Sequence, residues 1–135
     1  MMKKITSTKL PMNPQLTTML VNLIPATLSD RSVVMNFRDK SYSPETGGYH
    51  PVEISLRAIN QTEWHISYIT DFCFVGHGDY AELAKCLDFD VGQNVFQDLY
   101  QCTELGAGLE MFKLWQTNFL AYLKMGVFEI SVEQM

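Results

Sequence analysis

The chain has 135 residues, 47% of them hydrophobic and 19% charged, with a formal net charge of −5. This length and balance predict a single globular domain with its own buried core and exclude a disordered chain. The excess of acidic residues argues against nucleic-acid binding, because affinity for phosphate backbones depends on Lys and Arg.

The chain opens with a short polar segment and then a helix. Residues 1–12 are expected to be a flexible N-terminal tail, and residues 13–135 a single α+β domain. Asn13 can cap a helix and Pro14 suits its first turn, while apolar residues at three- and four-residue steps give one buried face up to about Leu23.

Alternation of apolar and polar residues predicts three strands. After a turn at 28–30, they are SVVMNFR (32–38), VEISLRAI (52–59) and EWHISYITDFCF (63–74). A turn at 60–62 makes the last two a hairpin. Strict alternation in the third strand predicts two opposite faces, one with Trp64, Ile66, Tyr68, Thr70, Phe72 and Phe74, the other with His65, Ser67 and Asp71.

The middle of the chain is harder to interpret. GHGD at 76–79 breaks the strand, since its glycines allow backbone angles that strand residues avoid. Residues 81–90 fit either a short helix or a strand. The turn residues at 91–94 favour a strand from about Leu83, paired as a hairpin with 95–102.

The last third predicts a long helix and a final strand. The helix runs from about Thr103 to Gly126 with a wide apolar face, and VFEISVE (127–133) alternates like a strand. The whole pattern predicts an α+β fold with one mainly antiparallel sheet, whose apolar face is covered by the N-terminal helix and this long helix.

Cysteine usage and hydropathy suggest where the protein resides. Cys73, Cys86 and Cys102 form no CxxC pair and lie in contexts typical of small buried hydrophobes. No segment has the roughly 18 apolar residues needed to cross a bilayer, and the apolar core of a signal peptide does not follow MMKK. A cytoplasmic protein without a membrane partner is expected.

One loop concentrates polar and aromatic residues. FRDKSYSPETGGYHPVEI, residues 37–54, joins the first two predicted strands and exceeds what a connection needs. Binding residues often lie on such loops. The alternative is that these side chains pair locally and the tyrosines pack over the sheet edge. The candidate ligand-binding residues of this loop are Arg38, Asp39, Tyr42, Glu45, Tyr49 and His50.

The same loop also carries a family resemblance. The pattern FRDxSYSxExGGYHPVEI, followed by WQxNFxxY and GVFEISV, resembles a family of small bacterial proteins of unknown function. The resemblance covers the chain from about Val33 onward. It implies an uncharacterised cytoplasmic α+β protein and supplies no reaction, cofactor or partner.

Signatures of catalysis and of metal binding are weak. His77 and Asp79 flank a glycine and could form a site with His50 or Asp71, but no HExxH or clustered signature is present, so no metal is predicted. No GxSxG or phosphate-binding loop occurs, so no cofactor is expected. Asp88 and Asp90 are interpreted as a solvated strand edge.

Two functional hypotheses follow. The first is a non-enzymatic binding or interaction module, possibly a homodimer through its last strand, that uses the 38–50 loop and the sheet's polar face, with His77 and Asp79 nearby, to engage a protein or a small polar ligand. The alternative is a small hydrolase-like enzyme, metal-assisted through His50, His77 and Asp79, with Arg38 holding an anionic substrate.

Overall fold

The computed structural model describes residues 2–6, 9–27 and 31–134. The turn predicted at 28–30 lies outside these residues. In chain order the elements are β1 (Lys4–Ile5), α1 (Pro14–Leu23), β2 (Ser32–Arg38), β3 (Val52–Ala58), β4 (Glu63–Val75), the 3₁₀ turn η1 (Gly78–Tyr80), β5 (Glu82–Asp90), β6 (Val95–Asp98), β7 (Cys102–Glu104), the 3₁₀ turn η2 (Leu105–Gly108), α2 (Leu109–Met125) and β8 (Glu129–Gln134).

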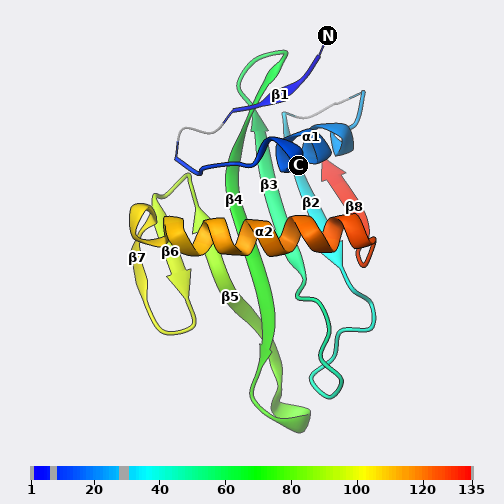
Figure 1. Cartoon of the computed structure of the whole chain (residues 1–135), viewed down its shortest axis with the longest axis vertical. Coiled ribbons are helices and arrows are strands. Elements are labelled where there is room, and N and C mark those ends of the chain that lie inside the picture. Colours follow the sequence, from blue (N-terminus) through cyan, green and yellow to red (C-terminus); the bar gives the residue numbers. More distant parts are fainter. Residues whose placement is uncertain (1, 7–8, 28–30, 135) are drawn as a thin grey trace.

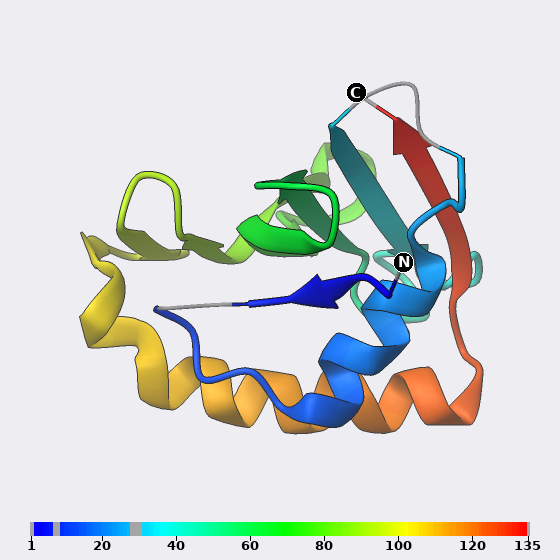
Figure 2. The same cartoon turned by 90° about the horizontal axis from the view of Figure 1, so that it is seen from above.

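The strands form one mainly antiparallel sheet. Their order is β7-β6-β5-β4-β3-β2-β8, and β1 pairs in parallel with β4. Helix α2 crosses the strands on one face of the sheet, with α1 on the same side (Figure 1). Figure 2 shows α2 below the sheet and α1 on the same side, rising at an angle from α2 toward the strands. The predicted α+β architecture is confirmed.

Local sequence signals explain the helix ends. The Asn13 side chain accepts a hydrogen bond from the Gln15 N–H at 2.8 Å, and Pro14 occupies the first turn of α1. Helix α2 ends at Gly126, as predicted. The ambiguous segment 81–90 contains strand β5 rather than a helix. No helix in the described part of the chain combines the length and apolar character needed to cross a membrane.

The core lies between the sheet and α2. Phe37 on β2 meets Phe119 of α2 edge-on, with ring centroids 5.1 Å apart, and neither ring is more than 2% exposed. Phe89 on β5 contacts Phe112 in the same way at 5.1 Å. Because large aromatic side chains dominate core energetics, these pairs fix α2 across the strands.

Part of the segment predicted to be a flexible tail packs onto the domain. Strand β1 pairs with the start of β4, where β5 no longer runs alongside because its pairing ends opposite Tyr68. Leu10 is 3% exposed. The buried Gln116 of α2 donates to the Pro11 carbonyl and accepts from the Asn13 N–H. Strand β1 and residues 10–12 therefore belong to the packed domain, although they lie before the expected boundary at Asn13.

The face assignment predicted for β4 is wrong beyond Ser67. In the pairing with β3, Ser55 lies opposite Tyr68 and Leu56 opposite Ile66, so Ser67 is an extra residue, a β-bulge. An extra residue reverses the faces of all following side chains. Buried Ile69, Asp71 and Cys73 consequently lie on the helix-covered side.

The prediction for residues 95–108 also needs correction. The single strand expected at 95–102 is split into β6 and β7, because the Asp98 carboxylate accepts the N–H groups of Tyr100 and Gln101 and forms a tight turn. The helix expected from about Thr103 begins at Leu109, after the 3₁₀ turn η2.

Gly108, where η2 meets α2, provides a test of the packing. A Cβ atom at Gly108 would lie 2.4 Å from Cγ of Phe96, whereas one at Gly106 would have no neighbour closer than 3.9 Å. We expect Gly108→Ala to lower the free energy of unfolding by about 1–3 kcal/mol through overpacking. Chemical denaturation of both alanine variants measures this effect, and an equal loss in Gly106→Ala would contradict it.

Candidate functional site

The loop between β2 and β3 is organised by one carboxylate. Asp39 accepts hydrogen bonds from the N–H and hydroxyl of Ser41, at 3.0 and 2.6 Å, and from the N–H of Tyr49 at 3.0 Å. Between them, Ser43 and Gly47 form an isolated bridge that closes the tip. The loop is therefore partly self-stabilised, as the structural alternative proposed.

Close packing explains a glycine in this loop. Gly48 has φ +139°, and a Cβ atom there would lie 2.8 Å from a carboxylate oxygen of Asp39 and 3.1 Å from Cα of Tyr42. Tyr42 in turn fastens the loop to β4, since its hydroxyl accepts the Phe74 N–H and its ring stacks on Phe74. These contacts hold Tyr49 and His50 next to the sheet.

The contacts of Asp39 predict that the loop between β2 and β3 is less stable at acidic pH. Hydrogen bonds from Ser41 and Tyr49 hold the pKa of Asp39 below its usual 3.8. A carboxyl whose pKa is lower in the folded state stabilises the fold above its unfolded pKa, and the contribution is lost as pH falls through the folded pKa. We expect the Tyr49 amide to exchange faster with solvent as pH falls below about 4, beyond the intrinsic pH trend, and Asp39→Asn to remove that dependence. Glu45→Gln, an exposed carboxyl of the same loop, is the control and should retain it.

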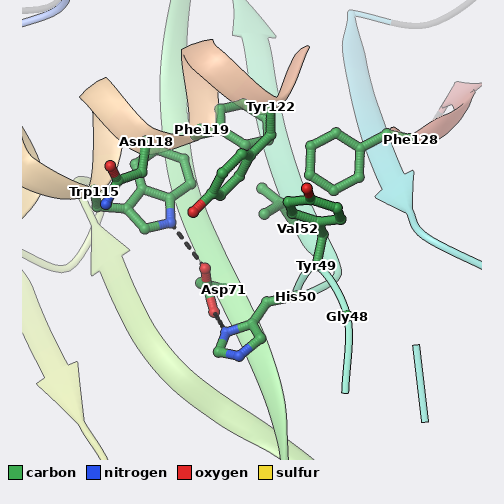
Figure 3. Close-up of a pocket in the computed structure, with 10 residues that line it drawn as sticks. All are labelled: Gly48, Tyr49, His50, Val52, Asp71, Trp115, Asn118, Phe119, Tyr122 and Phe128. Atoms are coloured by element: carbon green, nitrogen blue, oxygen red, sulfur yellow. Dashed lines mark hydrogen bonds and ion pairs between the residues drawn. The ribbon is translucent and has the colours of Figure 1, made fainter. Parts of the chain in front are cut away.

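A cavity of about 240 Å³ lies between this loop, the sheet and α2. Figure 3 shows the side chains around it, contributed by the loop, β3, β4, α2 and the residue before β8. The lining residues are Gly48, Tyr49, His50, Val52, Asp71, Trp115, Asn118, Phe119, Tyr122 and Phe128.

Asp71 is the polar centre of this cavity. It is only 8% exposed, and its carboxylate accepts the Trp115 Nε1–H at 2.9 Å while its other oxygen lies 2.7 Å from His50 Nδ1 (Figure 3). The hydrogen bond with Asp71 raises the pKa of His50, and partial burial opposes that rise. The bulge at Ser67 places Asp71 here, because without it the carboxylate would lie on the opposite face.

Aromatic rings form most of the remaining wall. The ring centroids of Tyr49 in the loop and Tyr122 in α2 are 4.7 Å apart. The ring of Trp115 stacks on that of Phe119, with a centroid distance of 4.8 Å. Phe128 closes the side next to β8 and contacts Phe119. Asn118 adds an amide at the rim, on the exposed side of α2. The cavity thus combines flat apolar walls with a few hydrogen-bonding groups.

Cys86 lies beside the Asp71 carboxylate, and the Cys73 thiol interacts with that of Cys86. His50, Asp71 and Cys86 each offer a ligand atom within 4.8 Å of the others, and they are the metal-competent group of three found among the described residues. Burial raises the pKa of the Cys86 thiol to about 12, with further contributions from Cys73 and Asp71. Both thiols are free.

The structure separates the predicted site residues into three sets. Tyr49 and His50 line the cavity, while Asp39 and Tyr42 hold the loop that carries them. The other four candidates lie outside the cavity on exposed positions, and none joins a metal-competent group of described residues: Arg38 at the end of β2, Glu45 in the loop, and His77 and Asp79 in the β4–β5 turn.

Sequence reasoning missed Trp115, Asn118, Tyr122 and Phe128 as site residues, and it considered Asp71 only as a possible metal-site partner of His77 and Asp79. One signal was available: ITDFCF places a single carboxylate in an apolar run, and buried carboxylates require partners. The partners could not be inferred, because Trp115 lies 44 residues away in the chain.

Comparison with known proteins identifies the family. A family model described as a protein of unknown function (DUF2787) matches residues 14–133. The chain belongs to this family. No curated protein matches this chain significantly. The predicted resemblance to small bacterial proteins of unknown function is confirmed.

Two solved structures are similar over nearly the whole chain, and both come from Vibrio cholerae. The hypothetical protein VC0508, from the VSP-II pathogenicity island, is 34% identical with a TM-score of 0.88, over 98% of this chain and 99% of its own. The conserved hypothetical protein VC1805, from pathogenicity island VPI-2, is 39% identical with a TM-score of 0.85, over 96% and 99%. VC1805 is described as sharing structural homology with the human P32 protein. Neither the family description nor these two structures assign a function.

Proposed function

We propose that this DUF2787 protein is a binding module, and that the cavity between the loop and α2 holds a small ligand with a flat ring and a hydrogen-bonding group. The observation that carries the proposal is the Asp71 carboxylate, buried among aromatic rings and held by Trp115 and His50 at the cavity wall. Apolar cavities with a few convergent polar groups are the usual form of small-molecule sites.

The size of the cavity limits the ligand. A volume of about 240 Å³ is below the range of about 300–1,000 Å³ typical of drug-sized ligands. Rings such as those of Tyr49 and Tyr122 favour a flat partner. The His50 side chain is 41% exposed, and because Nδ1 is engaged by Asp71, its Nε2 is the nitrogen left to meet a ligand.

The two tryptophans give the experiment an internal control. Benzoate, benzamide and glucose are titrated into ¹⁵N-labelled protein, which separates an anionic ring, a neutral ring and a polyol. We expect a ring probe to shift the Trp115 indole N–H signal and to leave that of Trp64, which is 1% exposed in the core, unchanged. Shifts of both indoles together, or no shift with any probe at millimolar concentration, would overturn the proposal.

A matched pair of tyrosine variants locates the binding. Tyr122→Ala removes a cavity wall, and Tyr80→Ala removes a ring that is 88% exposed in the β4–β5 turn. We expect the first to weaken probe binding by about tenfold, which corresponds to about 1.4 kcal/mol, and the second to leave it unchanged. Equal effects would place the binding elsewhere.

Cytoplasmic residence and homodimer formation are also part of this proposal. Strand β8 is the last strand in the sheet order and pairs with β2 on one side, which supports edge-to-edge pairing with a second copy. A molar mass of one chain in light scattering at micromolar concentration would rule out the dimer.

A further inference from the structure

Three potential metal ligands converge at the inner wall of the cavity. His50 comes from the loop, Asp71 from β4 and Cys86 from β5, and their ligand atoms all lie within 4.8 Å of one another. The three residues do not form a local sequence motif, so their convergence is a property of the tertiary structure. It was not anticipated from histidine and cysteine spacing.

Two bulges create the convergence. The extra residue Ser67 turns Asp71 toward the helices. A second irregularity lies in the β4–β5 pairing, where Asp71 pairs with Leu87 and Phe72 with Lys85, so that Cys86 is the extra residue. Bulges re-aim side chains and are common next to functional sites. Here the second bulge brings the Cys86 thiol to the Asp71 carboxylate.

A second sulfur lies beside the first. Cys73 follows Asp71 by two residues on β4, is 8% exposed, and its thiol interacts with that of Cys86. Asp71 itself is held in place by the Trp115 Nε1–H. Hydrogen bonds of this kind to a metal-binding carboxylate orient the ligand and are typical of metal sites.

We propose that His50, Asp71 and Cys86 bind a divalent transition-metal ion of the zinc class, with the Cys73 thiol next to the Cys86 ligand. The mixed nitrogen, oxygen and sulfur donors suit Zn²⁺ or Co²⁺, whereas Mg²⁺ and Ca²⁺ require oxygen ligands. Metal binding converts the Cys86 thiol to a thiolate and releases its proton to solvent. The inference does not depend on a ligand in the neighbouring cavity.

Cobalt provides a direct optical test. Full-length protein is stripped of metal with EDTA, reduced with a phosphine, and titrated with Co²⁺. We expect one equivalent to produce a thiolate-to-cobalt charge-transfer band, which Zn²⁺ then removes by displacement. The absence of the band with excess Co²⁺, in protein whose near-ultraviolet circular dichroism shows a folded state, would overturn the proposal.

Cysteine and histidine variants assign the ligands. Cys86→Ser should abolish the band, and Cys102→Ser, at an exposed cysteine of β7, should retain it with the same affinity. His50→Ala alters a half-buried loop position and should weaken Co²⁺ binding by roughly tenfold or more even if Cys86→Ser fails to fold. A band that persists in Cys86→Ser, or disappears in Cys102→Ser, would contradict the assignment.

A variant that touches no metal tests the role of Trp115. Trp115→Phe keeps the ring and removes the N–H that holds Asp71. Loss of such an orienting hydrogen bond typically lowers metal affinity by about 10–100-fold. Unchanged Zn²⁺ affinity in competition with a chromophoric chelator would show that the Trp115 hydrogen bond does not orient a metal ligand.

Discussion

Replacement of Phe119 by alanine is expected to lower the free energy of unfolding by about 3–5 kcal/mol. The ring is 2% exposed and lies where α2 meets the sheet. It contacts Phe37 edge-on at 5.1 Å, stacks on Trp115 at 4.8 Å and meets Phe128 at 5.6 Å. Its loss removes both the buried area and the aromatic contacts, and it leaves a void next to the cavity.

A second position on α2 is the control for that measurement. Leu114 lies five residues earlier on the same helix and is 60% exposed. Leu114→Ala should change the free energy of unfolding by no more than about 0.5 kcal/mol. Urea denaturation followed by circular dichroism compares the variants. Equal stability of the two would mean that α2 does not cover the sheet through Phe119.

Replacement of Asp71 by alanine should cost about 2–4 kcal/mol, measured with EDTA present so that metal binding does not contribute. The physical reason is the buried Trp115 indole, whose N–H would lose its acceptor, together with the bond to His50. The cost lies below that of a fully buried ion pair, because the His50 side chain is 41% exposed.

Asp79 and Trp115 supply the controls for Asp71. Asp79→Ala, in the exposed β4–β5 turn, should be nearly neutral. A double-mutant cycle of Asp71→Ala with Trp115→Phe should give a coupling of about 0.5–3 kcal/mol, as expected for groups in contact. Additive losses would show that the hydrogen bond contributes nothing to stability.

The stability losses expected for Phe119→Ala and Asp71→Ala concern the same wall of the cavity, and therefore also its function. Phe119 and Asp71 line it, one as a ring and the other as the polar centre. If the stability losses are as large as expected, the cavity wall is rigid, and a ligand or metal ion would meet preorganised groups. Binding experiments on this DUF2787 protein should therefore use variants at half-buried lining residues, such as Tyr122 and His50, before those at the buried Phe119 and Asp71.

Most of the secondary structure could be predicted from local patterns. Strands β2 and β3 and the first half of β4 follow from alternation, and α1 and α2 from apolar periodicity with Asn13 and Gly126 at their ends. These features depend on a few neighbouring residues, because a strand exposes alternate side chains and a helix one stripe. The loop with Tyr49 and His50 was recognised for the same local reason.

Elements that depend on partners were predicted less well. The described residues before Asn13 were expected to form a tail, but they pair with β4 and are held by Gln116 of α2, more than 100 residues away in the chain. His77 and Asp79 were grouped with His50 from composition alone, and the β4–β5 turn places them elsewhere. A pattern shows which residues are polar, and long-range pairing decides which of them meet.

The amino-acid sequence by itself determined the α+β class, both helices and most of the strands, and the polar loop, because each rests on local propensity and periodicity. Only the tertiary structure decided the site. Two extra residues, Ser67 and Cys86, change the pairing of β4 with its neighbours. That change brings Asp71 to the helix-covered face beside Trp115 and His50. A bulge is defined by the strand opposite it, so alternation along one strand cannot reveal it.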